Sequence, residues 1–509
     1  MPPSARYLAA SAALLFLLGC GKQLLTWGIG PGPLISDAQQ YWELSGEVLR
    51  GDWMLSTSGL DYRTPFYPVF LAGMRWLFAE QALLATVVVQ HGLFVVTHLL
   101  VAGITWRLTG SGIAALLAYG VTVVSLMETW FANVVGTEAW FMLFLTAAAG
   151  ALCLYHERPS GRWAMVFGCL FGVAALVRPV PKLLWIPLVG VFALHATSWV
   201  PRRVGVLELM RHALAAAGVT MLILAPWCGR NACLFGEPFL ARLPAVNKWQ
   251  VCFQGGSAAA LAIPVTPEGN RIRALIGDER GQVRDRYCYA VIGALEQRGL
   301  SDRQIDELVT AVCVQAVAAD PWGFAWPAFK RCVNYWRCVP NGIPYYDVAT
   351  DGGAVGRPDW EWAGVADFQR RVLRRSPAHW VRWNELVLAL CIAGTWQLVR
   401  RRSTRLMGIS VALIFLYFTA VTSLVEIENF KYRVVLEPCV IFATVSGWYG
   451  CWRGRHRPAD DGASHGQGTT DTVPYGWPFP RGISQWKEAE PIQASPEHDD
   501  PVPSGRRYT

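Results

Sequence analysis

Residues 82–105, ALLATVVVQHGLFVVTHLLVAGIT, contain no Asp, Glu, Lys or Arg. A helix of this length can cross the hydrocarbon core of a bilayer, which takes roughly 20 apolar residues. Similar stretches recur along the chain, and we expect further spans near 7–27, 112–128, 136–155, 163–178, 183–197, 209–227, 382–399, 406–425 and 433–451. These stretches predict an all-α polytopic membrane protein with about ten spans.

The composition of the whole chain agrees with this expectation. Its 509 residues are 53% hydrophobic and 16% charged, and the mean hydropathy is +0.28. Soluble domains usually carry about 25% charged residues, so the apolar excess here must face lipid. The formal charge of +8 is explained by basic loops on one membrane face, and we expect no nucleic-acid partner.

Basic loops predict the orientation, because Lys and Arg in short loops stay on the cytoplasmic side. The basic loops are Arg107, 156–162, Arg202 and Arg203, 400–405 and 453–457. Their alternation places both termini in the cytoplasm and a first loop, 28–63, outside. Residues 64–79 would break the alternation if they crossed the membrane, so we expect an interfacial or re-entrant helix there.

Hydropathy divides the chain into four parts. Residues 1–227 form a transmembrane bundle, and 381–452 form the C-terminal spans. Between them, 228–380 is rich in Gly, Pro, Asp and Arg, which predicts an extracytoplasmic, mainly helical domain of ordinary size. Residues 453–509 cannot bury enough apolar surface to offset the entropy of ordering, which predicts a disordered cytoplasmic tail.

Within the predicted outer domain, one helix is clearly marked. Ser301 and Gln304 have the spacing of a capping box, and the helix that they begin should end near Asp320-Pro321. The Trp-rich residues 321–337 that follow predict a helix on the membrane surface. Seven of the thirteen cysteines fall in 228–380, which leaves a disulfide open in an oxidising compartment, without a readable pairing.

Ionisable residues gather at the outer ends of the predicted spans. Such residues are costly in a membrane, so they are commonly paired or functional. The acidic candidates are Asp37 and Glu138, and the basic candidates are Arg63, Arg178, Lys182, Arg230, Lys431 and Arg433. A carboxylate can take a proton from an attacking hydroxyl, while Arg and Lys can neutralise a phosphate in a substrate and in a leaving group. The mixture suits a substrate with its phosphate at headgroup level, although positioning ion pairs would also explain it.

Six short segments carry a family resemblance. They are SDAQQYW (36–42), RTPFYPVFLAG (63–73), GTEAWF (136–141), LVRPVPKLLWIP (176–187), APWCGRNACLFGEP (225–238) and KYRVVLEPCVIFA (431–443). In this order the segments resemble the GT-C glycosyltransferases of family 39, which include protein O-mannosyltransferases and bacterial aminoarabinose transferases. The resemblance implies a GT-C-like transmembrane bundle, a polyprenyl-phosphate sugar donor, an extracytoplasmic acceptor and inversion at the anomeric carbon.

The resemblance also implies roles for single residues. Asp37 matches a catalytic base or acceptor-orienting acid, Glu138 a second acid near the donor, and Arg63 a contact to the lipid phosphate. Arg178 and Arg230 match arginines with phosphate-binding or structural roles, and Lys431 and Arg433 match basic residues before the last span. With Lys182, these cations form the expected donor-phosphate set.

A departure from the family pattern bears on metal binding. Many relatives carry two adjacent acids in the first loop, whereas Ser36 and Ala38 flank Asp37 here. We therefore expect no metal site at Asp37, and a divalent cation that bridges a carboxylate and the phosphate stays an open alternative.

Other functions remain open at this point. A transporter or flippase for a lipid-linked glycan would also hold charges within a helix bundle, although such charges usually lie near the membrane midplane. An assembly or receptor protein would use 228–380 for binding. Under the transferase interpretation the partners are membrane lipid, a polyprenyl-phosphate-linked sugar, and a glycan, lipid or protein acceptor at the cell membrane.

Overall fold

The computed structural model describes residues 3–27, 31, 34, 37–58, 61–125, 131–199, 203–255, 258–277, 287–337, 377–426 and 430–455. Across these ranges all regular structure is helical, which confirms the all-α class. The predicted tail beyond 455 and the 338–376 portion of the predicted outer domain lie outside the described residues.

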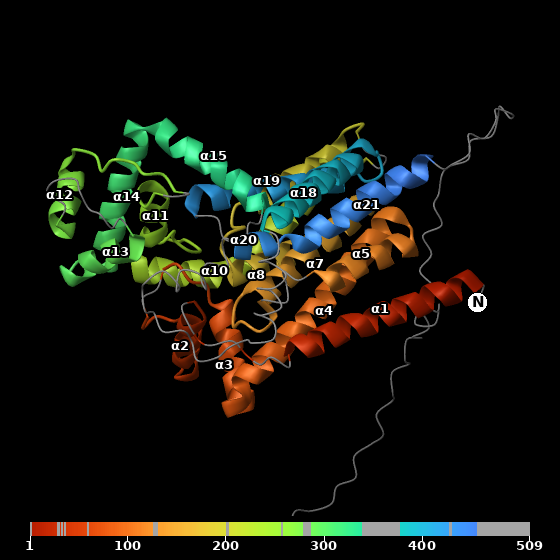
Figure 1. Ribbon diagram of the computed structural model, residues 1–509, viewed down its shortest axis with the longest axis horizontal. Coiled ribbons are helices and arrows are strands. Elements are labelled where there is room, and N and C mark those ends of the chain that lie inside the picture. The colour runs from red at the N-terminus through yellow and green to blue at the C-terminus, as the bar shows by residue number, and fades with distance from the viewer. Residues whose placement is uncertain are drawn as a thin grey trace, which may run out of the picture. The chain divides into compact units, whose positions relative to one another are not determined.

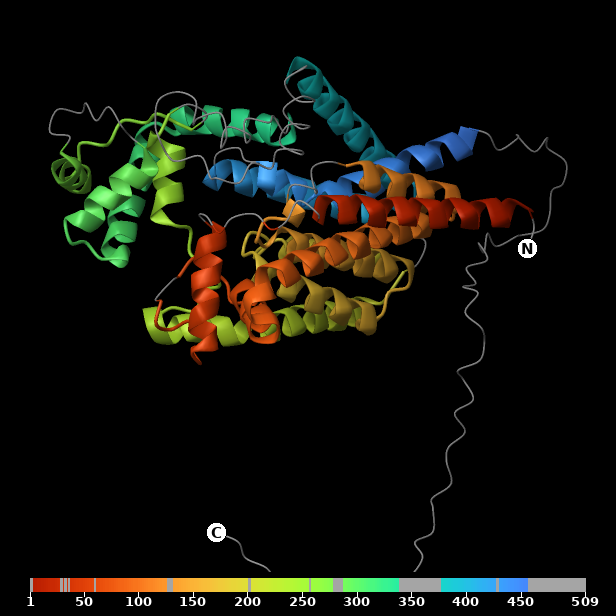
Figure 2. The ribbon, with the colours of Figure 1, turned by 60° about the horizontal axis from the view of Figure 1, so that its bottom comes forward.

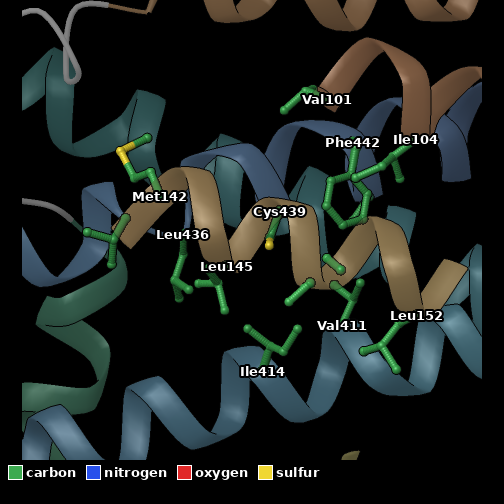
Figure 3. Packing of buried hydrophobic residues seen from close by; sticks show 14 of the residues in the cluster. Val101, Ile104, Met142, Leu145, Leu152, Val411, Ile414, Leu436, Cys439 and Phe442 are labelled. Atoms are coloured by element: carbon green, nitrogen blue, oxygen red, sulfur yellow. The ribbon is translucent and has the colours of Figure 1, made fainter. Parts of the chain in front are cut away.

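Long apolar helices form the larger of the packed regions (Figure 1). They are α1 (Pro3–Trp27), α4 (Ala82–Thr109), α5 (Gly112–Val124), α7 (Glu138–Glu157), α8 (Gly161–Val177), α10 (Val206–Phe235), α18 (Pro377–Arg400), α19 (Arg405–Val425) and α21 (Glu437–Arg455). Helix α8 packs between α7 and α10, while α4 packs on α5, α7 and α21. Side chains such as Leu145, Val411, Ile414 and Phe442 meet in the shared core (Figure 3).

Small residues let two of these helices approach closely. Gly394 of α18 and Gly447 of α21 lie at the crossing of the two helices, and a Cβ at Gly447 would lie 2.1 Å from the Gly394 carbonyl oxygen. Any larger residue would therefore push the backbones apart. Such close contacts between small residues are typical of helices that pack within a bilayer.

Among the described residues, five helical stretches are long and apolar enough to cross a membrane, judged by length and composition, or six if the bent pair Asp302–Ala319 and Pro321–Trp336 is one span. The five are Arg6–Trp27, Phe66–Thr109, Glu138–Glu157, Val206–Phe235 and Arg405–Val425. The predicted spans at 112–128 and 163–178 correspond to the shorter apolar helices α5 and α8. The predicted span at 183–197 is divided into α9 (Trp185–Gly190) and the 3-10 helix η2 (Val191–Ala196). The number of ten spans therefore stays a prediction.

The predicted first loop, 28–63, contains one short helix, and the predicted interfacial segment, 64–79, forms another. Helix α2 (Asp37–Leu49) packs against α3 (Phe66–Phe78), and the 3-10 helix η1 (Ala79–Gln81) joins α3 to α4. Ala79 has a φ of 46°, an uncommon value for a residue other than glycine, where the chain turns between α3 and α4. The segment 64–79 is thus helical, and its place at the membrane interface stays a prediction.

A smaller group of helices has its own core. It comprises α11 (Ala245–Phe253), α12 (Pro267–Ile276), α13 (Cys288–Gln297) and α14 (Asp302–Ala319), which gather together in Figures 1 and 2. Trp249, Phe253 and Val309 are fully buried among them. Residues 228–235, predicted to begin this domain, are instead the last turns of α10.

The helix that the capping box at Ser301 and Gln304 predicts in this group is confirmed as α14. The Ser301 side chain accepts from the Gln304 backbone while Gln304 reaches back to Ser301, and α14 ends at Ala319. Helix α15 (Pro321–Arg337) then leaves at a bend of 100°. On α15, Trp322 and Trp326 are exposed, which suits the predicted membrane-surface helix.

Candidate active site

Asp37 is the first residue of α2, and its carboxylate lies between two cations. Arg63 Nη2 is 2.6 Å from Oδ1, and Lys431 Nζ is 3.4 Å from Oδ2. Arg63 is held in place by two further bonds, from Nε to Gln40 Oε1 at 2.8 Å and from Nη1 to the Tyr41 hydroxyl at 3.1 Å. The first turn of a helix also favours a negative charge. Helix α2 therefore supplies both the acid and the groups that orient its main cation.

A second ion pair comes from two other helix ends. Glu138 begins α7, Arg178 directly follows α8, and Arg178 Nη2 is 3.2 Å from Glu138 Oε1. The two side chains are 10% and 12% exposed, so this pair is much better shielded from water than Asp37, whose side chain is 47% exposed.

Tyr432 joins the two ion pairs. It lies in the short helix α20 (Phe430–Val434), and its ring centroid is 5.5 Å from the Arg178 guanidinium and 5.2 Å from Lys431 Nζ. Cations are attracted to the electron-rich face of an aromatic ring. Arg178 and Lys431 are thereby held close together although their charges repel.

The Lys431–Tyr432 segment is fixed from two sides. The Tyr432 hydroxyl donates to Glu426 Oε1 at 3.0 Å, and Asn247 of α11 donates to the same oxygen. From α15, the Tyr335 hydroxyl donates to the Tyr432 carbonyl oxygen at 2.9 Å. The smaller helical group, through Asn247 and Glu426, and α15, through Tyr335, thus both hold the segment that carries Lys431.

The pKa values of the Asp37 and Glu426 carboxyl groups are shifted in opposite directions. Burial alone would raise the pKa of Asp37, but the charges of Lys431 and Arg63 outweigh it and hold the pKa well below its usual value. Burial raises the pKa of Glu426, and Lys431 and the two hydrogen bonds offset this effect only in part. Asp37 is therefore ionised at neutral pH, while the protonated form of Glu426 is favoured relative to a free carboxyl group.

The remaining predicted cations bond to other groups. Lys182 Nζ donates to the Ala241 carbonyl oxygen at 3.1 Å, and Arg433 Nη1 is 2.8 Å from Glu437 Oε2. Arg230 is buried and its Nε donates to the Met54 carbonyl oxygen at 2.9 Å. The structure thus brings Arg63, Arg178 and Lys431 together with Asp37 and Glu138. A donor-phosphate role for Lys182, Arg230 and Arg433 stays a prediction.

Aromatic and amide side chains of the cluster were not among the candidates. Tyr41, Gln40 and Tyr432 each contact a charged member of the cluster. Their positions within QQYW and KYR, next to the predicted acid and cations, are the sequence signal that could have identified them.

The surroundings of Asp37 do not fit a divalent cation. Both carboxylate oxygens face cationic side chains, which would have to be displaced by a metal ion. Within the described ranges, no three His, Cys, Asp or Glu side chains come together as a ligand group. The geometry suits an anion that replaces or joins the carboxylate, such as a phosphate.

Comparisons with known proteins give structural likeness alone. No family model matches the sequence, and no curated protein matches it. Several solved structures are similar. One is the Archaeoglobus fulgidus oligosaccharyltransferase in the apo form, with 12% identity over 88% of this chain and 51% of that chain, and a TM-score of 0.46. This chain therefore spans about half the length of that enzyme.

Two further similar structures contain a lipid phosphate. AglB from Archaeoglobus fulgidus, in complex with an inhibitory peptide and a dolichol-phosphate, is 13% identical over 92% of this chain and 53% of that chain, with a TM-score of 0.45. ArnT from Cupriavidus metallidurans, bound to undecaprenyl phosphate, is 15% identical over 81% of this chain and 76% of that chain, with a TM-score of 0.36.

Proposed function

We propose that this chain is a membrane glycosyltransferase that moves a sugar from a polyprenyl-phosphate donor to an extracytoplasmic acceptor, with inversion at the sugar carbon. The observation that carries the proposal is the Asp37 carboxylate between Arg63 and Lys431. The order of sequence segments that resembles the family 39 enzymes gives the reaction class.

The charge of the cluster favours a phosphate. Arg63, Arg178 and Lys431 carry three positive charges, and Asp37 and Glu138 carry two negative charges, which leaves one net positive charge when Glu426, whose pKa is raised by burial, is protonated. Cations placed where a leaving group gains charge stabilise the transition state of the transfer. Because apolar helices surround the cluster, the phosphate of a lipid donor could reach it while the prenyl chain stays in the bilayer.

The reaction is a direct displacement. The oxygen of an acceptor hydroxyl attacks the anomeric carbon as the bond from that carbon to the phosphate oxygen breaks. The phosphate leaves with the electron pair and is neutralised by the cations, while the hydroxyl proton passes to the Asp37 carboxylate and then to solvent. An amine acceptor would lose its proton in the same way.

The low pKa of Asp37 bears on its role. With Arg63 and Lys431 both paired to it, the carboxylate is a weak base. A bound phosphate would draw these cations away and so raise the basicity of Asp37 just when the acceptor needs it. Before that, the ionised carboxylate can still orient the acceptor by accepting its hydrogen bond.

We place the chain in the cell membrane, which is the inner membrane of a cell with two. It crosses this membrane several times, with the active face extracytoplasmic and both termini cytoplasmic, as the basic loops predict. On this view the acceptor is a protein, a lipid or a glycan of the cell envelope.

The proposal is tested by mass spectrometry of cell-envelope glycans and glycoproteins from cells that lack the gene. The cells are complemented with the natural chain, with Asp37→Asn or with Glu43→Gln, a matched control because Glu43 lies on the same helix and is exposed. One modification should be missing without the gene and with Asp37→Asn, and present with the other two. Restoration by Asp37→Asn would overturn the proposal.

A transporter or flippase for a lipid-linked glycan is the alternative. Transporters usually hold such charges near the membrane midplane, whereas the orientation that the basic loops predict puts Asp37, Glu138 and Arg178 at the outer ends of the spans. A flippase would also leave the lipid-linked glycan unconsumed, which the same mass spectra would show as the intact donor.

A further inference from the structure

Two cysteines from distant segments meet inside the smaller helical group. Cys252 lies near the end of α11 and Cys313 in the second half of α14, and they are 4% and 7% exposed. Their side chains lie close enough for each to shift the pKa of the other. Both belong to the same buried cluster, between the packed helices α11 and α14, so the two thiols lie near each other and away from water.

The register of the two helices fixes this meeting. Lys248 Nζ is 2.6 Å from Asp306 Oδ1 and 2.8 Å from Thr310 Oγ1. One turn further along α14, Cys313 Sγ is 3.5 Å from the Lys248 carbonyl oxygen. Asp306, Thr310 and Cys313 share one face of α14, and Cys252 lies one turn after Lys248 on α11. The contacts of Lys248 with that face therefore place Cys313 beside the turn of α11 that carries Cys252.

We propose that Cys252 and Cys313 form a disulfide in the cell, which clamps α11 to α14. The inference rests on the proposed function in one respect: that function puts this domain on the extracytoplasmic side, where oxidising conditions let disulfides persist. The proximity of the two thiols in the fold is independent of that placement.

The chemistry is ordinary thiol–disulfide exchange with a disulfide-bearing oxidant, such as an oxidised dithiol protein or oxidised glutathione. One thiol of the pair ionises first, because the thiolate is the nucleophile. This thiolate attacks the oxidant and forms a mixed disulfide. The thiolate of the other cysteine then displaces the oxidant, so two thiol protons and two electrons leave the pair and the oxidant departs as two thiols.

The clamp would act on the candidate active site as well. Helix α11 also carries Asn247, whose amide donates to Glu426 beside Tyr432. A covalent link from α11 to α14 therefore restrains the helix that contacts Glu426, the hydrogen-bond partner of Tyr432. Reduction would loosen this contact without removing any charged residue of the cluster.

The test is differential alkylation of the full chain. Membranes are prepared without reductant and denatured in N-ethylmaleimide, and the protein is then reduced, labelled with iodoacetamide and analysed by peptide mass spectrometry. We expect the iodoacetamide label on Cys252 and Cys313, and N-ethylmaleimide on Cys288, which lies in α13 of the same buried cluster. In Cys313→Ser, Cys252 should switch to N-ethylmaleimide. If Cys252 kept the iodoacetamide label there, the pairing would be wrong.

A second arm separates this inference from the proposed function. The purified chain is treated with oxidised glutathione before the same labelling. N-ethylmaleimide on both cysteines in membranes, followed by the iodoacetamide label after oxidation, would overturn the disulfide in the cell together with the extracytoplasmic placement. N-ethylmaleimide on both cysteines in both arms would overturn the pairing itself and leave the proposed function untouched.

Discussion

Replacing Asp37 with Asn should separate sugar transfer from donor binding. The substitution keeps the size of the side chain but removes the charge that lies between Arg63 and Lys431. Loss of a base or orienting carboxylate lowers a transfer rate by about 10²- to 10⁴-fold. Donor binding should change in the opposite direction, because Asp37 repels the phosphate that the same cations attract.

The size of that repulsion follows from the geometry. Lys431 Nζ is 3.4 Å from Asp37 Oδ2, and a charge-assisted hydrogen bond to a phosphate on its other side adds about 2.8 Å. Two unit charges roughly 6 Å apart repel by about 2.7 kcal/mol at an effective dielectric constant of 20 and by about 0.7 kcal/mol in bulk water. Since the Asp37 side chain is 47% exposed, we expect an intermediate value of about 1 to 2 kcal/mol, which tightens phosphate binding roughly 5- to 30-fold.

Binding is measured by calorimetric titration of a polyprenyl phosphate into the purified chain in lipid nanodiscs, and transfer by the envelope mass spectra described above. Glu43→Gln, which removes an exposed charge from the same helix, should change neither. Weaker phosphate binding by Asp37→Asn would refute the reasoning, because Asp37 would then serve mainly to position its cations. Unchanged transfer would refute it as well.

Three further predictions concern the neighbouring charges. Glu138→Gln leaves the shielded Arg178 without its carboxylate partner and should lower the free energy of unfolding by about 3 kcal/mol or more, measured as thermal unfolding in detergent. Lys431→Met should weaken polyprenyl-phosphate binding about tenfold or more with a smaller change in unfolding, whereas Arg230→Met, which loses buried bonds to backbone carbonyls, should destabilise the fold. Because the pKa of Glu426 is raised in the folded chain, stability should fall as pH rises from the ordinary carboxyl range through the raised value, and Glu426→Gln should flatten that limb of the stability curve.

These outcomes have matched comparisons. Glu307→Gln removes an exposed carboxylate from the Arg303 pair, whose side chains are 74% and 64% exposed, and should cost well under about 1 kcal/mol. An equal loss in Glu138→Gln and Glu307→Gln would contradict the importance of shielding. If the stability of Glu426→Gln depended on pH in the same way as that of the natural chain, the fall in stability with rising pH would not come from Glu426.

Hydropathy is enough to predict most helices, because a backbone in lipid must satisfy its hydrogen bonds within each segment. The predicted span at 82–105 lies within α4, and that at 209–227 lies within α10. The capping box at Ser301 and Gln304 also predicted correctly where α14 begins. The prediction at 183–197 corresponds to one apolar helical stretch, Trp185–Ala196, which changes from α-helix to 3-10 helix after Gly190, a change that hydropathy does not register.

The charged cluster was predictable as a list of residues and not as a set of contacts. Lys431 and Arg433 are both basic and two positions apart, yet Lys431 contacts Asp37 and Arg433 contacts Glu437. On a helix such neighbours point to different sides, and the packing of α20 decides which side meets α2. The bonds of Arg230 to backbone carbonyls of residues about 175 positions away likewise arise from long-range packing and have no local sequence signal, and its predicted phosphate role stays a prediction.

The two charges that meet at Asp37 and Lys431 are 394 positions apart along the chain. During synthesis, the acid of α2 therefore emerges long before its second cation is made. A ribosome must pass position 431 before that contact can exist, so shorter products would carry Asp37 without its second cation. Under the proposed function, transfer activity would therefore report that the chain had been made and inserted at least as far as Lys431.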